Sequence, residues 1–307
     1  MRHWLLALIA CWTLTTQAAV PVRDLTLAFD EFYTRTMQWA LEDRVVEFRR
    51  TIGAQFPQFY GDERGTWSPA EQDVRIAAAI AGYPALRDAY LKKAREFRVQ
   101  LPHHLAAFQQ RFPGYRLPSD VWIVHGLGEM DGGTRDLAGR HYLIFAADGM
   151  AKYHRDNDEA AFFHHELFHT YHEPRLQACR GQAVWYGLWT DGLATYVSHQ
   201  MHPQASGKEL LLDFPDGSVT RTQANLPVAW DQLAQVLEST DADIYASLFQ
   251  MRGQHPVLPA RRGYYLGYLV AQEAARTRDI SELAAMDCQT AHELVAGTVR
   301  KLRMQSR

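Results

Sequence analysis

Cysteine is scarce in this chain of 307 residues, which contains only Cys11, Cys179 and Cys288. Neither Cys179 nor Cys288 has the closely spaced partner that a thiolate metal site requires, so no such site is expected. In an exported protein these two residues form one disulfide or remain two separate buried thiols, and the sequence leaves both alternatives open.

An excess of charge of either sign is also lacking. The formal net charge is −3 at pH 7, and no block of like charge stands out. Because a nucleic-acid interface normally needs a cluster of lysine and arginine, no nucleic-acid partner is expected. The composition, 47% hydrophobic and 22% charged, is that of a globular protein with one large domain or two lobes.

Long apolar runs are missing beyond the N-terminus, and the run over residues 4–14 is too short to span a bilayer. A basic residue precedes this run and small residues follow it. This pattern predicts a secretory signal peptide over residues 1–19, cleaved after Ala18 or Ala19, and therefore a periplasmic or secreted protein without a transmembrane segment. The alternative is a lipoprotein, because LIAC matches a bacterial lipobox that would anchor the chain through Cys11.

The hydrophobic pattern changes twice along the chain. Helical periodicity dominates from Leu25 to about Phe112, and a capping box of Ser68 and Glu71 marks one helix start. Two β-branched and aromatic segments follow, at 121–124 and 141–147, with a long glycine-rich turn between them. Helical periodicity then returns, so the order predicts an α+β fold that is mainly helical with a small antiparallel sheet.

The segment FFHHELFHTYHE, residues 162–173, contains His165-Glu166-Leu167-Phe168-His169, an HExxH motif. On a helix, residues four apart share a face, so His165 and His169 are expected to bind one metal ion, Zn²⁺. Glu166 is then placed to act as general base on a water molecule that the metal activates.

Two residues compete to complete the metal site. His172 shares the helix, but it lies about 10 Å from His165 along the axis at 1.5 Å per residue. Two zinc–nitrogen bonds of about 2 Å do not close that gap, so His172 is expected at the rim or surface. Asp191 lies in a second apolar helix, where an unpaired charge is costly, and is the expected third ligand. The alternative is that a hydrogen bond or an arginine satisfies Asp191.

Three motifs, in this order, resemble those of the gluzincin zinc peptidases, and in particular a bacterial family of predicted zinc-dependent proteases. They are HExxH, then DGLATY at 191–196 where that family has EGLAxY, then RRGYYLGYLVAQE at 261–273 where it has a GYxxGY helix. The resemblance implies a zincin-like metallopeptidase domain over 20–307, with lobes at about 20–173 and 174–307. It also implies that His165, His169 and Asp191 bind zinc and that Glu166 is the catalytic base.

The chain departs from this pattern in two places. Aspartate replaces glutamate at 191, and Thr195 stands where related peptidases often have a carboxylate that orients a zinc-binding histidine. Another carboxylate or a backbone carbonyl must then orient that histidine. An edge strand at 140–149 is expected to pair with extended substrate, although a purely structural sheet fits equally well. A tyrosine among Tyr264, Tyr265 and Tyr268 is a candidate for stabilising the oxyanion, although core tyrosines would look the same.

The expected function is therefore that of an exported zinc metallopeptidase, a hydrolase that cleaves peptide or protein substrates. The alternative is a catalytically inactive zinc- or peptide-binding protein on the same fold. A third interpretation is a different hydrolase with the same motif; peptide deformylase is disfavoured because its upstream cysteine ligand is missing. The intact Glu166 favours the enzyme, since a protein that only binds has no need of the base.

Overall fold

The computed structural model describes residues 22–117, 121–181, 183–251 and 255–307. The expected signal peptide at 1–19, including the alternative anchor Cys11, lies outside these residues. Within the described part of the chain, every helix is too short or too polar to cross a membrane.

A group of helices precedes most of the sheet. The helical pattern that begins at Leu25 is divided into two helices, and Pro57 opens a short helix instead of ending one, because the first position of a helix needs no N–H donor. The elements are β1 (Val22–Asp24), α1 (Thr26–Thr36), α2 (Leu41–Thr51), η1 (Gly53–Gln55), α3 (Pro57–Tyr60), η2 (Asp62–Arg64) and α4 (Pro69–Arg111).

The start of α4 confirms the predicted capping box. The Ser68 side chain accepts a hydrogen bond from the Glu71 N–H, and the Glu71 carboxylate accepts one from the Ser68 N–H. The helix continues through Pro84 and Pro102 to Arg111.

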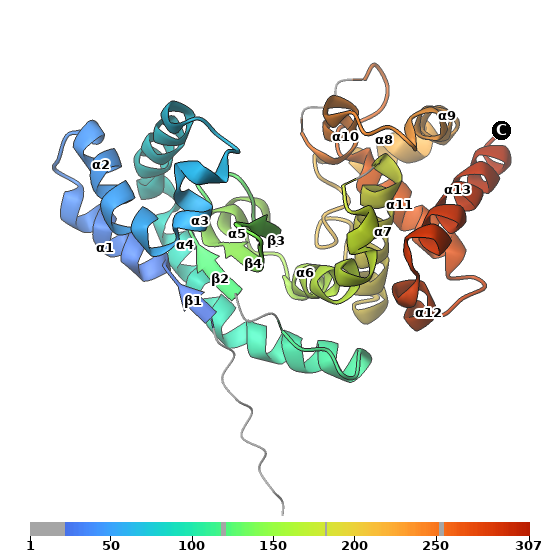
Figure 1. Ribbon diagram of the computed structural model, residues 1–307, viewed down its shortest axis with the longest axis horizontal. Helices are drawn as coiled ribbons and strands as arrows, with labels where there is room; N and C mark the ends of the chain where they lie inside the picture. Colours follow the sequence, from blue (N-terminus) through green and yellow to red (C-terminus); the bar gives the residue numbers. More distant parts are fainter. Residues whose placement is uncertain (1–21, 118–120, 182, 252–254) are drawn as a thin grey trace, which may run out of the picture.

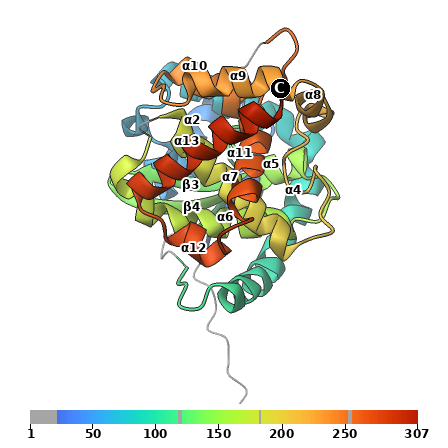
Figure 2. The ribbon, with the colours of Figure 1, turned by 90° about the vertical axis from the view of Figure 1, so that its right-hand side faces the viewer.

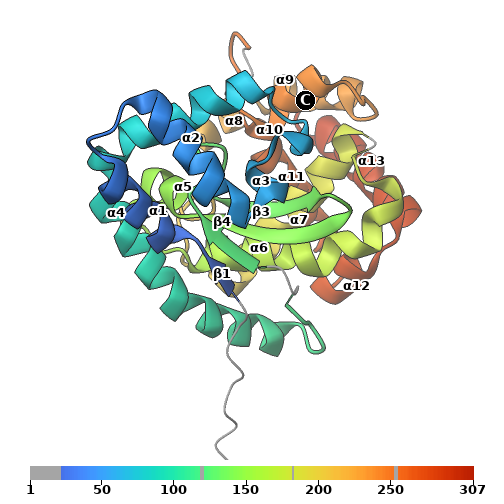
Figure 3. The same cartoon turned by 60° about the vertical axis from the view of Figure 1, so that its left-hand side comes forward.

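The sheet has four strands in the order β1-β2-β4-β3 and is mixed, so the prediction of an antiparallel sheet is wrong (Figure 3). β2 (Val121–Val124) and β4 (Arg140–Ala146) are the two predicted strands, and they pair in parallel. β1 also pairs with β2 in parallel, and β3 (Gly132–Leu137) pairs with β4 in antiparallel orientation.

The extra strand β3 explains the error in direction. It lies within the glycine-rich segment that was interpreted as a turn, and its sequence GGTRDL carries little β propensity. Ala138 and Gly139, both with positive φ, close a tight hairpin between β3 and β4. The chain therefore reverses direction twice, once between β2 and β3 and again at this hairpin, so β4 runs parallel to β2.

The remaining elements are all helical. In Figure 1, α6 lies between the sheet and the helices that follow, and Figure 2 shows α13 crossing in front of α7 and α11. These elements are α5 (Ala147–Tyr153), α6 (Ala160–His172), η3 (Glu173–Cys179), α7 (Val184–Met201), α8 (Ser218–Ala224), α9 (Leu226–Val236), α10 (Ala242–Phe249), α11 (Arg262–Ala274), α12 (Ile280–Ala285) and α13 (Cys288–Gln305). The chain is therefore an α+β protein, mainly helical.

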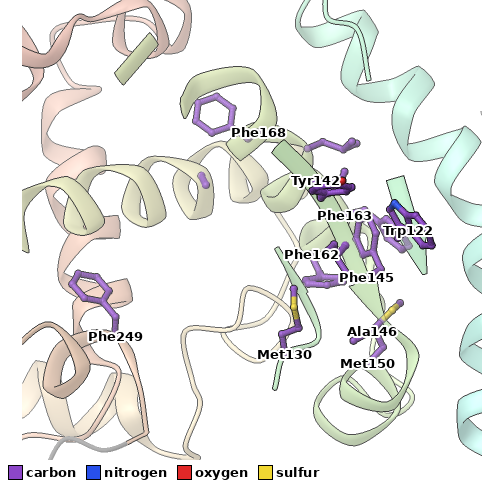
Figure 4. Packing of buried hydrophobic residues seen from close by; sticks show 14 of the residues in the cluster. Trp122, Met130, Tyr142, Phe145, Ala146, Met150, Phe162, Phe163, Phe168 and Phe249 are labelled. Atoms are coloured by element: carbon purple, nitrogen blue, oxygen red, sulfur yellow. The ribbon is translucent and has the colours of Figure 1, made fainter. Parts of the chain in front are cut away.

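Aromatic side chains hold α6 against the sheet. Phe162 and Phe163 both contact Phe145 of β4, with ring centroids 5.8 and 5.3 Å away (Figure 4). Phe168 points elsewhere and packs on Phe112 at the end of α4. Each fully buried phenylalanine contributes roughly 1.5–3 kcal/mol to stability, so α6 is firmly held in place.

Cys179 and Cys288 form a disulfide, which decides between the two alternatives that the sequence left open. It joins the end of η3 to the start of α13 across 109 positions of sequence. The segment that follows α6 is thereby tied to the C-terminal helix.

Candidate metal centre

His165, His169 and Asp191 come together from two helices, as predicted. His165 Nε2 lies 2.9 Å from His169 Nε2, and Asp191 Oδ1 lies 3.9 and 3.6 Å from these two atoms. From these three distances, the point that is equally far from all three atoms lies about 2.0 Å from each of them. That is the length of a zinc–nitrogen or zinc–oxygen bond. They form the one group of three potential metal ligands within the described residues, and the group could hold a metal ion.

Close helix packing brings Asp191 to this position. A Cβ atom at Gly192 would lie 2.3 Å from the carbonyl carbon of Gly267, and one at Gly267 would lie 2.3 Å from the Leu188 carbonyl oxygen. Neither position has room for a side chain, so α7 and α11 touch along their backbones beside Asp191.

Each histidine has a partner that orients its ring. His169 Nδ1 lies 2.9 Å from Glu173 Oε1, and His165 Nδ1 lies 3.3 Å from Thr195 Oγ1. The Thr195 hydroxyl donates its hydrogen to the Asp191 carbonyl, so it can only accept from His165. These two contacts favour the proton on Nδ1 of each neutral ring, which leaves its Nε2 lone pair available to a metal.

Glu173 is the carboxylate that orients His169. The sequence predicts such a group without identifying the residue. Arg180 Nη2 lies 3.1 Å from its Oε2, and the Thr134 hydroxyl of β3 donates to the same oxygen. Glu173 follows α6 directly, four residues after His169, so the i, i+4 spacing could have identified it.

The surroundings shift the pKa values of the ligands in opposite directions. Burial raises the pKa of Asp191 to about 6, although the charge of His169 partly offsets this effect. Burial disfavours a charged His169, yet its hydrogen bond to Glu173 and the charges of Glu173 and Asp191 raise its pKa to about 9. For His165, burial and the charge of His169 hold the pKa well below its usual range. The carboxylates thus create a local preference for positive charge, which a divalent cation satisfies.

Glu166 lies beside the group and directly below β3. Its Oε2 is buried without a hydrogen-bond partner among the described residues, and burial raises the pKa of its carboxyl group to about 8. A Cβ at Gly132 would lie 2.5 Å from the Phe162 ring and 3.4 Å from Glu166 Cγ, while one at Gly133 would lie 3.8 Å from Oε2. The two glycines therefore let the strand run close over Glu166.

The edge strands of the sheet are β1 and β3, so the expectation of an edge strand at 140–149 is wrong. β4 lies between β2 and β3, and its backbone is paired on both sides. The Ala146 N–H donates to the Asp131 carbonyl, which sets the alternation of ladder bonds. By this alternation, the backbone N–H and C=O groups of Gly133 and Arg135 form hydrogen bonds with β4. The backbone groups of Thr134 point away from β4, toward the outer edge of the sheet.

Of the three candidate tyrosines, Tyr264 is the one associated with the site. Burial raises the pKa of Tyr264, and the negative charges of Asp191 and Glu166 raise it further. Tyr265 accepts a hydrogen bond from Gln223, and the Tyr268 hydroxyl lies 2.8 Å from His199 Nδ1. Tyr265 and Tyr268 thus have other partners.

The two remaining histidines of α6 lie outside the group. His164 is buried and contacts His202, with a ring-nitrogen separation of 2.6 Å. His172 is fully buried between Phe168 and Trp189, so the expectation of a rim or surface histidine is wrong. It packs against these two rings and takes no part in the ligand group.

Comparisons of the chain with protein-family models, curated proteins and solved structures found no match. The resemblance to gluzincin peptidases therefore stays a prediction from the motifs at 165–169, 191–196 and 261–273. The geometry of the three potential ligands, Glu166 and β3 is independent of that resemblance.

Proposed function

We propose that this protein is a zinc-dependent peptidase of the gluzincin type, with a zincin-like fold. The observation that carries the proposal is the convergence of His165 Nε2, His169 Nε2 and Asp191 Oδ1 beside the unpartnered carboxylate oxygen of Glu166. Two imidazoles and a carboxylate are a common ligand set of catalytic zinc sites, which keep a further position open for water or substrate.

His165, His169 and Asp191 would hold the zinc ion, and Glu173 and Thr195 would keep the two rings in orientation. A zinc ion bound there supplies a Lewis acid, which polarises a carbonyl group and lowers the pKa of water to about 7. Glu166 would accept a proton from the water and then deliver it to the leaving amine, as a general base and then a general acid.

The free edge of β3 offers a place for an extended peptide. Its outward-facing groups at Thr134 can pair with a substrate backbone as one more strand, which supports a peptide or protein as substrate. Gly132 and Gly133 keep that edge close to Glu166. The Tyr264 hydroxyl, which its raised pKa keeps protonated, is available to donate to a developing oxyanion.

The disulfide between Cys179 and Cys288 supports a location in an oxidising compartment. It agrees with the signal peptide predicted for residues 1–19. We therefore place the proposed enzyme in the periplasm or outside the cell.

Metal analysis and a peptide-library assay test the proposal together. Purified wild-type protein should contain about one zinc per chain and cleave peptides, because one ligand group is available. Glu166→Gln should keep the zinc and lose nearly all cleavage, since it preserves shape but removes the base. Zinc-loaded wild type without any cleavage would favour the binding protein, and wild-type activity in Glu166→Gln would refute the assignment of the base.

A further inference from the structure

Arg261 and Arg262, at the start of α11, differ in the hydrogen-bond partners of their guanidinium groups. Arg262 is buried, and its guanidinium donates to Gln232 Oε1 at 2.7 and 3.1 Å, to the Ser247 carbonyl at 3.0 Å and to the Pro259 carbonyl at 3.1 Å. These bonds join α9, α10 and the start of α11. Arg262 is therefore a structural residue.

Arg261 has no such partners. Its Nε is buried without a hydrogen bond, and its guanidinium forms no ion pair with any carboxylate in the described ranges. Instead the guanidinium lies over two aromatic rings, 4.3 Å from the centroid of Tyr264 and 5.5 Å from that of Phe214. Stacking on rings orients a guanidinium and leaves its hydrogen-bond donors unused.

Arg261 also lies near the metal centre. Its φ of 58° is in the left-handed region, which is uncommon for a residue with a side chain. The ring on which it stacks, Tyr264, lies one turn before Gly267 on α11, and Gly267 contacts Gly192 next to Asp191. Its positive charge acts on Asp131 as well as on His165 and Asp191. Strained backbone and an unsatisfied cation together mark a functional position.

We propose that Arg261 recognises a carboxylate group of the substrate at the metal centre, an inference that rests on the proposed peptidase function. A guanidinium binds a carboxylate through two parallel N–H donors, and Arg261 has these donors free. The carboxylate is either the C-terminus of the peptide, which makes the enzyme a carboxypeptidase, or an acidic side chain within it. Both sources present the same chemistry to Arg261.

Peptide retention by zinc-loaded Glu166→Gln protein tests this without relying on turnover. Randomised hexapeptide pools with free or amidated C-termini are passed over the immobilised full chain, and retained peptides are identified by mass spectrometry. Preference for the free acid identifies a terminal carboxylate, and enrichment of Asp and Glu in the amidated pool identifies a side chain. Adding Arg261→Gln should reduce the preference about 10- to 100-fold, because a hydrogen-bonded charge pair is lost, and Arg261→Lys should restore part of it.

Arg262→Gln is the matched control, since it removes the neighbouring guanidinium. It should lower the melting temperature and leave the preference unchanged; exposed Arg278 provides a second control, Arg278→Gln, that keeps the fold. A preference that survives Arg261→Gln, or no preference in the parent protein, would overturn the inference. Cleavage without carboxylate preference would refute this inference alone, whereas retention that depends on Arg261 without any cleavage by wild type would refute only the peptidase.

Discussion

The metal-facing side of α6 and its core-facing sides carry the same residue type in different surroundings. His169 lies beside Glu173 and Asp191, and their charges raise its pKa to about 9 despite burial. His172, one turn later, lies between aromatic rings, and burial lowers its pKa to about 3. Contacts with Glu173 and Asp191 therefore distinguish His169 from His172, although both rings are buried.

Removing one of the two histidines that face the metal should have the largest effect on zinc binding. His165→Ala or His169→Ala should abolish stoichiometric zinc binding and all zinc-dependent cleavage, because two donor atoms cannot hold the ion tightly. His164→Asn, on another side of the helix, should keep zinc and lose only stability. Elemental analysis and thermal unfolding of the three variants check this, and loss of zinc in His164→Asn alone would reverse the assignment of the two sides.

The third ligand separates the two-helix site from a one-helix site. Asp191→Ala should weaken zinc binding by more than roughly 100-fold, beyond the effect of losing an orienting partner, whereas His172→Ala should leave zinc affinity nearly unchanged. Asp191→Glu should keep the metal, because it restores the residue of the resembled family. Competition titrations with a zinc chelator measure all three. Wild-type affinity in Asp191→Ala together with loss in His172→Ala would contradict the two-helix site.

Glu173 is the carboxylate that makes His169 unlike His172. Glu173→Gln should lower zinc affinity by about 10- to 100-fold, since His169 loses the partner that orients its ring and increases its basicity. The same titrations measure it, with Glu238→Gln as a control, because Glu238 pairs with His292 on the surface. Equal affinities for Glu173→Gln and the control would show that the contact to His169 is dispensable.

Competition between protons and zinc should give the smallest effect, a gradual change of zinc affinity with pH. Metal-free His169, with a pKa of about 9, must lose its proton before its nitrogen can bind zinc, so affinity should rise about tenfold per pH unit from pH 6 to 8. Below about pH 6 Asp191 also takes up a proton, and the dependence should steepen. Glu173→Gln lowers the pKa of His169 and should flatten the slope. A flat profile in wild type would show that His169 is neutral in the metal-free protein.

Local features were the most predictable from the sequence. The capping box at Ser68 and Glu71, the strand Val121–Val124 and the buried HExxH helix all match the structure. Each depends on residues a few positions apart, whose spacing fixes their relative geometry.

Features that depend on partners distant in the chain were missed. β3 has weak propensity and exists because β4 provides a ladder for it, so its edge role could not be predicted. His172 has the same helical phase as a ligand would have, and only Trp189 on α7 shows that it is buried. The choice of Tyr264 over its two neighbours depends on how α11 crosses α7.

By itself the sequence determined the mainly helical α+β class and the ligand candidates His165, His169 and Asp191, because helical periodicity and motif spacing are local properties of the chain. Only the tertiary structure decided that Asp191 meets the two histidines, that Glu173 and Thr195 orient them, and that Arg261 stays unpaired beside them. Those outcomes depend on how α6, α7 and α11 pack against one another, including the backbone contact between α7 and α11 at Gly192 and Gly267. Contacts between helices are set by the packing of the whole core.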